Sequence, residues 1–230
     1  MPLGRKLVVE FIGTFFLVFT VCTATSPKTG AGTLAPLAIG AVLMVMVFAG
    51  GHISGGHYNP AVSTAVALRG KLGSDEFLPY VVSQALGALI AAALARVAAG
   101  GGHAAPLPGY GRELIVEFLF TFALCFVVLN VATARGTEGN SFYGLAIGFT
   151  VAAGAFAVGG ISGGAFNPAV AVGAMVMGLL EWSNIWVYLL ANLLGGAVAA
   201  WVFMYTQPGE KVLGDTVAGE ASDLPGEQLA

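Results

Sequence analysis

The sequence contains one nine-residue pattern twice, as SGGHYNPAV at residues 54–62 and as SGGAFNPAV at residues 162–170, 108 positions apart. Each copy begins with residues typical of a loop and ends with the triplet Asn-Pro-Ala. The two triplets are Asn59, Pro60, Ala61 and Asn167, Pro168, Ala169. Asn is a favoured N-cap residue, and Pro is well tolerated at the first helical position because no intrahelical partner awaits its missing N–H. Both copies therefore predict the start of a helix.

The composition is that of a membrane protein. The chain has 230 residues, of which 57% are hydrophobic and only 9% are charged, and its mean hydropathy is +0.86. A formal net charge of −3 leaves no basic face for nucleic acid. Cys22 and Cys125 lie in apolar stretches without the spacing of metal ligands, and we expect buried free thiols. No motif predicts an enzyme, a cofactor or a metal site.

Six apolar runs are long enough to cross a hydrocarbon core of about 30 Å, which takes about 20 helical residues. They lie at residues 7–25, 34–51, 78–99, 114–134, 142–159 and 185–205. Two shorter runs, 59–68 and 167–180, begin at the Asn-Pro-Ala triplets and reach about halfway at about 1.5 Å per residue. The sequence thus predicts an all-α membrane protein with six transmembrane helices and two half-helices.

The chain is a tandem duplication. The offset of 108 also places residues 38–40 over 146–148, and Glu10 aligns with Glu117 after one residue of slip. The first apolar run could resemble a cleaved signal peptide, but its counterpart in the second half identifies it as part of the fold. Each copy holds three spans, an odd number, so the second copy enters the membrane from the opposite side and the repeats are inverted.

We therefore expect a single domain over residues 1–206, with repeat one at about 7–99 and repeat two at about 112–206. Lys and Arg in short loops favour the cytoplasmic side. Six of them fall on the side of the N-terminus and three on the other, which predicts that both termini are cytoplasmic. We expect the plasma (inner) membrane as the location. Residues 207–230 are acidic and predict a poorly ordered cytoplasmic tail.

Inversion brings the two half-helix N-termini together at the membrane midplane. The irregular backbone before each of them, predicted at residues 50–58 and 159–166, cannot face lipid and must line protein or water. The pore-lining backbone would come from Gly55, Gly56, His57, Gly163 and Ala165. Two positive helix ends would repel a cation there, while the amides of Asn59 and Asn167 would orient a neutral molecule. For His57, a packed loop residue and a pore-lining or pH-sensing residue remain equal alternatives.

With its two Asn-Pro-Ala triplets in mirrored halves, each half with a Glu in its first span, the chain resembles the aquaporin (major intrinsic protein) family. The resemblance runs from about residue 7 to residue 205. It implies a right-handed bundle of six helices and two half-helices, one pore per chain, and a homotetramer in membrane lipid. It also implies that Glu10 and Glu117 brace the half-helix loops.

The sequence departs from water-selective relatives at the outer constriction. Those relatives usually carry an Arg after the second Asn-Pro-Ala, where this chain has Val170. Counting from the motifs predicts a selectivity filter of Ile39, Ala155, Gly164 and Val170, none of them charged or aromatic. This pattern is similar to plant tonoplast intrinsic proteins, which implies passage of ammonia, urea or hydrogen peroxide with water.

Three functions fit inverted repeats with broken helices. The first is a passive channel for water and small neutral solutes that excludes ions and protons. The second is a secondary transporter, although no ionisable residue other than His57 lies close to the two Asn residues. The third is a junctional or scaffolding membrane protein, which is supported only by the absence of an Arg after the second Asn-Pro-Ala.

Overall fold

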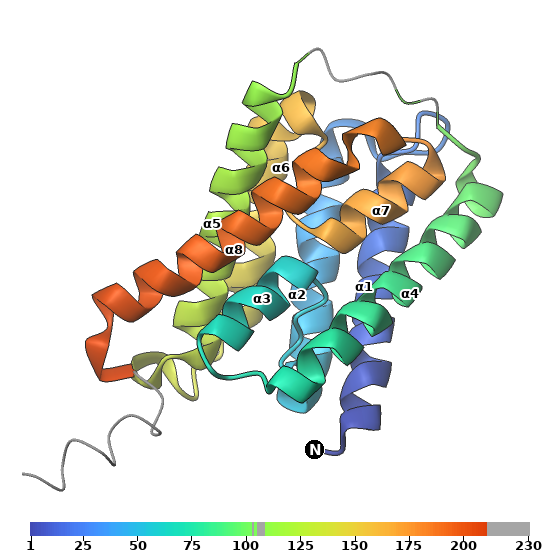
Figure 1. Cartoon of the computed structure of the whole chain (residues 1–230). Coiled ribbons are helices and arrows are strands. Elements are labelled where there is room, and N and C mark those ends of the chain that lie inside the picture. The colour runs from blue at the N-terminus through green and yellow to red at the C-terminus, as the bar shows by residue number, and fades with distance from the viewer. Residues whose placement is uncertain (103, 105–108, 211–230) are drawn as a thin grey trace, which may run out of the picture.

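The computed structural model describes residues 1–102, 104 and 109–210. Within this part the secondary structure is helical (Figure 1). The α-helices are α1 (Leu3–Ala24), α2 (Ala35–Ser54), α3 (Pro60–Leu68), α4 (Ser74–Ala99), α5 (Gly111–Thr133), α6 (Tyr143–Ser162), α7 (Pro168–Met177) and α8 (Ile185–Thr206). Short 3-10 turns are η1 (Gly32–Leu34), η2 (Arg135–Thr137), η3 (Trp182–Asn184) and η4 (Pro208–Glu210).

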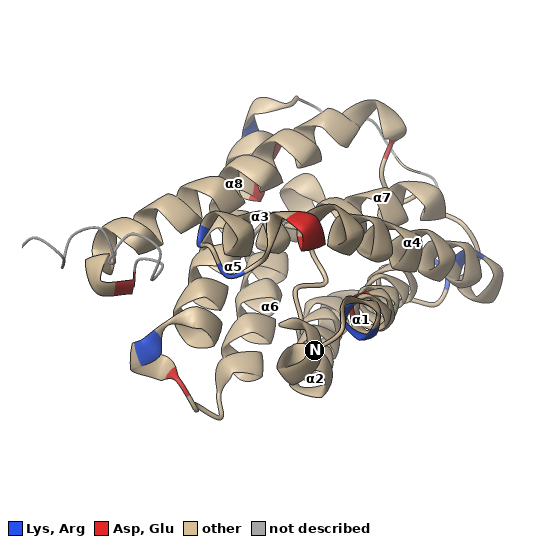
Figure 2. Ribbon diagram, turned by 60° about the horizontal axis from the view of Figure 1, so that its bottom comes forward, with Lys and Arg blue, Asp and Glu red and all other residues tan. Residues whose placement is uncertain are grey.

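Six of the described helices are long and apolar enough to cross a membrane: α1, α2, α4, α5, α6 and α8. The spans that contain α2 and α8 also include the turns η1 and η3 directly before them. Their outer faces carry exposed large hydrophobic side chains, among them Val8, Phe16, Leu86, Leu119 and Phe149. In Figure 2 most of the ribbon is free of charged residues. Such a surface suits lipid, because apolar side chains there need no cover from water.

The two repeats pack in the same way. Helix α1 lies against α4 as α5 lies against α8. A Cβ atom on Gly87 of α4 would lie 2.6 Å from the carbonyl oxygen of Phe11, and one on Gly195 of α8 would lie 2.8 Å from that of Phe118. Small residues at matched positions thus let the helix backbones touch in both pairs. The predicted inverted repeat is confirmed.

The half-helices join the repeats to each other. Helix α3 from repeat one packs against α8, and α7 from repeat two packs against α4. In Figure 1, α3 and α7 lie one above the other in the middle of the bundle. Each repeat therefore completes its core with the half-helix of the other, which fixes the two half-helices relative to one another.

The loops before the half-helices are shorter than the sequence predicts. Helix α2 continues through Ser54 and α6 through Ser162, where Gly50 and Gly159 were expected to begin irregular backbone. The helices end at Gly55 and Gly163, which have φ values of 91° and 88° in the left-handed region that glycine adopts without strain. Gly50 and Gly159 themselves remain helical. The second half-helix also ends earlier than expected, at Met177, because Gly178 takes a left-handed conformation there.

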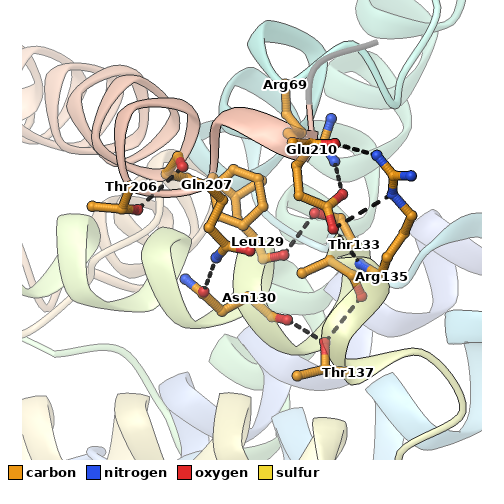
Figure 3. Close-up of polar contacts among 12 residues, drawn as sticks. Arg69, Leu129, Asn130, Thr133, Arg135, Thr137, Thr206, Gln207 and Glu210 are labelled. Atoms are coloured by element: carbon orange, nitrogen blue, oxygen red, sulfur yellow. Dashed lines mark hydrogen bonds and ion pairs between the residues drawn. The ribbon is translucent and has the colours of Figure 1, made fainter. Parts of the chain in front are cut away.

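Residues 207–210, the start of the expected tail, belong to the described structure. Pro208–Glu210 form η4, and Glu210 binds two arginines (Figure 3). Its Oε2 lies 2.8 Å from Nη2 of Arg69, which is buried. Its Oε1 accepts the backbone N–H of Arg135 at 2.7 Å. Charge pairing thus orders a segment whose composition alone indicates disorder. Residues 211–230 of the expected tail lie outside the described residues.

Candidate functional site

Two Asn side chains lie where the half-helices meet. Oδ1 of Asn59 accepts the N–H of Ala61 at 2.8 Å, and Oδ1 of Asn167 accepts that of Ala169 at 2.9 Å, so both residues cap their own helices as expected. Each amide nitrogen crosses to the other repeat. Nδ2 of Asn59 donates to the carbonyl oxygen of Phe166 at 2.9 Å. Since an amide nitrogen carries two hydrogens, one on each Asn remains for a further acceptor.

The reciprocal bond, from Nδ2 of Asn167 to the carbonyl oxygen of Tyr58, also measures 2.9 Å. Tyr58 and Phe166 have φ values of 50° and 47°, the only positive values among the described residues other than glycine. Such a conformation costs of order 1–3 kcal/mol and persists only where the surroundings impose it. Here it turns each backbone N–H towards a carboxylate and each carbonyl towards the opposite Asn.

Those carboxylates belong to Glu10 on α1 and Glu117 on α5, both fully buried. Glu10 accepts four hydrogen bonds, from Oγ of Ser54 and the N–H of His57 at 2.7 and 2.9 Å, and from the N–H of Tyr58 and Nε2 of Gln84 at 2.7 and 2.8 Å. A buried carboxylate is tolerated when its oxygens are satisfied in this way.

The second repeat holds its loop with the same arrangement. Glu117 accepts bonds from Ser162, Ala165, Phe166 and Asn192 at 2.7 to 2.9 Å. The Ser and amide partners were not among the expected site residues, although Gln84 and Asn192 occupy matching positions in the duplicated sequence. The geometry agrees with the bracing role that the resemblance implies for Glu10 and Glu117.

A cavity of about 20 Å³ lies beside the two Asn residues. A site needs about 10–15 Å³ to hold one water, so this is room for a single molecule. Its polar lining includes Asn59, Asn167 and His57. Aliphatic side chains supply most of the rest: Leu17, Val21, Leu43, Val62, Leu124, Val128, Ile147 and Val151. None of the described residues that line it is charged.

Three of the four expected filter residues, Ile39, Gly164 and Val170, line this cavity. Ala155 does not, although its Cα lies 3.6 Å from where a Cβ on Gly164 would stand. Val151, one turn earlier on α6, lines the cavity instead. Of the expected loop backbone, Gly56, His57 and Ala165 line it, and Gly55 lines a wider cavity described next. Gly163 is part of neither lining among the described residues.

The wider cavity is a vestibule of about 640 Å³ on the side of the chain's N-terminus. It touches the small cavity at His57 and Val128, which line both. Its walls carry charges of both signs, from Lys6, Lys71, Arg135, Glu76 and Glu138. Lys6 and Glu76 form an ion pair at 2.7 Å. A wide mouth with charges of both signs therefore leads to a small, uncharged cavity.

The outer ends of the half-helices are held by guanidinium groups. Arg69 is the C-cap residue of α3, and its Cζ lies 5.0 Å above the ring of Phe203. Arg96 on α4 donates to the carbonyl oxygen of Val176, near the end of α7, at 3.1 Å. Cations are stabilising at helix C-termini, so both helix dipoles have their positive ends at the small cavity and their negative ends at an arginine.

Comparisons with known proteins agree with this geometry. A family model described as "Major intrinsic protein" matches residues 1–51 and 37–203. The chain belongs to the major intrinsic protein family. It is 38% identical to aquaporin NIP1-1 of Zea mays over 214 residues, which cover 88% of this chain and 75% of that protein. It is 37% identical to nodulin-26 of Glycine max over 98% of this chain and 86% of that protein.

Among solved structures, this major intrinsic protein is similar to the aquaglyceroporin from Plasmodium falciparum. The TM-score is 0.71 at 21% identity, and the match covers 94% of this chain and 99% of the other. That likeness confirms the aquaporin fold. The family and the six apolar helices together make the chain an integral, multi-pass membrane channel, and its relatives are channels rather than enzymes.

Proposed function

We propose that this protein is a passive channel that conducts water and small neutral solutes and excludes ions and protons. The observation that carries the proposal is the pair of crossed bonds at 2.9 Å between Asn59 and Phe166 and between Asn167 and Tyr58. They place two amide donors beside a cavity with room for about one water.

Ion exclusion follows from the electrostatics of the small cavity. Each half-helix presents about half a positive elementary charge at its N-terminus, so a cation beside Asn59 and Asn167 meets two repulsive ends. No carboxylate offsets them among the described lining residues. A water that accepts hydrogen bonds from both amides turns its own hydrogens away, which opposes proton transfer along the water file.

The solute range depends on the proposed filter of Ile39, Ala155, Gly164 and Val170. None of these side chains carries a charge or a hydrogen-bonding group, so they add no electrostatic barrier for a solute. They also offer no hydrogen bonds in place of the water molecules that a solute sheds there. This favours small neutral molecules such as ammonia, urea and hydrogen peroxide. The small volume of the cavity favours the smallest of them.

We propose that four copies assemble in the plasma (inner) membrane with both termini in the cytoplasm. The excess of Lys and Arg on the side of the N-terminus supports this orientation. The family supports the homotetramer. Labelling of intact cells that carry a single introduced cysteine tests the orientation, by comparing positions 2 and 139 with position 30. Chemical cross-linking of the purified protein tests the assembly.

Stopped-flow light scattering of proteoliposomes tests the channel. We expect fast water flux, together with urea and ammonia flux, that rises linearly with the gradient. Saturable uptake that depends on an ion gradient would instead favour the secondary transporter. Val170→Arg should retain water flux and suppress solute flux, and Val170→Leu is its control for size without charge. Solute flux that survives in Val170→Arg would contradict the proposed filter.

A further inference from the structure

His57 is the one ionisable residue at the junction of the two cavities within the described lining. Its Nδ1 lies 3.1 Å from Oγ of Ser63 on α3. A neutral imidazole carries its hydrogen on one nitrogen only, so the direction of this bond decides what Nε2 offers to the pore. The neighbours of Ser63 determine that direction.

The first constraint comes from Glu10. All four of its partners are donors, so the carboxylate acts as an acceptor only. Gln84 must therefore turn its amide nitrogen towards Glu10, since its oxygen would otherwise face a carboxylate oxygen. The second hydrogen of the same nitrogen points to Oγ of Ser63, at 3.0 Å.

The second constraint is the hydroxyl hydrogen of Ser63. Its oxygen already accepts from Gln84, so the hydrogen needs an acceptor of its own. The neighbouring Thr64 donates to the carbonyl of Pro60 at 2.9 Å, as helical hydroxyls commonly do. Among the described residues, the hydroxyl of Ser63 forms no hydrogen bond to a backbone carbonyl oxygen. The acceptor within reach of its hydrogen is Nδ1 of His57.

We propose that Glu10, Gln84 and Ser63 act as positioning residues that hold His57 in the tautomer with its hydrogen on Nε2. This inference rests on the proposed channel function and deepens it. A Cβ on Gly55, which lines the vestibule, would lie 3.0 Å from Nε2, so Nε2 then presents a donor where the two cavities meet. It has no free electron pair towards the water file, so His57 does not accept a proton from it.

The charged groups around His57 leave this arrangement intact. Glu10 and Lys6 on α1 and Glu76 on α4 are the charges that act on the ring, and Lys6 is paired with Glu76. From α4 the ring of Tyr80 also packs against it, with centroids 5.2 Å apart, and its hydroxyl donates to the carbonyl of Ser54 at 2.8 Å. Glu10 acts on the ring through Gln84 and Ser63 and through the His57 backbone N–H.

The second repeat provides a matched control. It has Ala165 in the place of His57 and Ala171 in the place of Ser63. Asn192, the counterpart of Gln84, donates its second hydrogen to Oγ1 of Thr121 at 2.6 Å instead. Thr121→Val thus removes a hydroxyl that accepts a hydrogen bond from the same kind of side-chain amide. Unlike the hydroxyl of Ser63, this one is not hydrogen-bonded to a histidine.

The test is nitrogen-15 NMR of the histidine side chains in the full-length protein in lipid bilayers, with His57→Asn used to assign the resonance. The parent and Ser63→Thr should show the Nε2–H tautomer. Ser63→Ala should show a mixture of tautomers or the imidazolium, and Thr121→Val should match the parent. An Nδ1–H tautomer in the parent, or an unchanged signal in Ser63→Ala, would overturn the proposal.

Flux measurements complete the test. Ser63→Ala should acquire a dependence of water or proton flux on pH around the ordinary histidine pKa of about 6.5, which the parent and Ser63→Thr lack. A flat profile in Ser63→Ala would overturn the role in proton exclusion. A parent that conducts no water would refute the channel proposal, whereas the NMR result would still decide the tautomer.

Discussion

The amide nitrogen of Asn167 lies 2.9 Å from the carbonyl oxygen of Tyr58, a residue of the other repeat 109 positions earlier. The mirrored bond from Asn59 to Phe166 has the same length. Each Asn therefore caps its own half-helix with its oxygen and fastens the opposite loop with its nitrogen. The two repeats are tied to each other beside the small cavity.

Replacing Asn167 by Asp should weaken this tie. The variant keeps the capping oxygen but places a carboxylate oxygen against the carbonyl of Tyr58, at a cost of about 1–3 kcal/mol or more. We expect a lower unfolding temperature and reduced water flux. Asn130→Asp is the matched control, because Asn130 also donates to a carbonyl, that of Phe126, but lines neither cavity. Equal losses of flux in both variants would contradict this account.

Glu117→Gln should disrupt the second loop. Gln has one acceptor oxygen in place of two, so its NH2 group would face donors that Glu117 now satisfies, including the N–H of Phe166 at 2.8 Å. We expect loss of water flux and of thermal stability. Glu113→Gln, one turn earlier on α5, is the control, because Oε2 of Glu113 is buried without a hydrogen-bond partner among the described residues. Normal flux in Glu117→Gln would show that the brace is dispensable.

Gly87→Ala should separate α1 from α4. The added Cβ would lie 2.6 Å from the carbonyl oxygen of Phe11, which is backbone and cannot rotate away. Overpacking of this kind typically costs about 1–3 kcal/mol, so the unfolding temperature followed by tryptophan fluorescence should fall. In Gly160→Ala the new Cβ meets nothing within 4 Å, and stability should be retained. A parent-like unfolding temperature in Gly87→Ala would argue against close backbone contact.

Glu210→Gln should destabilise the vestibule wall. It leaves the buried guanidinium of Arg69 without its counter-charge, and breaking a buried pair costs up to about 3–5 kcal/mol. Arg135→Ala should have a much smaller effect, since its side chain is 72% exposed. Removal of residues 211–230 should behave like the parent, whereas removal of residues 208–230 should behave like Glu210→Gln. Equal stability of the two truncations would refute a role for Glu210.

Much of the fold could be predicted because its signals are local. Hydrophobic run length identified the six spanning helices, and Asn-Pro identified both half-helix starts to the residue. The ends of α2 and α6 could not be predicted, since Gly50 and Gly159 are compatible with both helix and loop. Likewise, the net composition of the C-terminal segment indicated disorder, and only the buried position of Arg69 explains why Glu210 is ordered.

The sequence by itself determined the family, the duplication and the inversion, because run length, helix caps and the parity of three spans do not depend on distant contacts. Tertiary structure decided which groups face the pore. The crossed bonds of Asn59 and Asn167 join the two repeats, the bond between Ser63 and His57 joins α3 to the loop before it, and Val151 rather than Ala155 of α6 lines the cavity. Their geometry depends on how the helices tilt and rotate against each other, which hydrophobic periodicity leaves open.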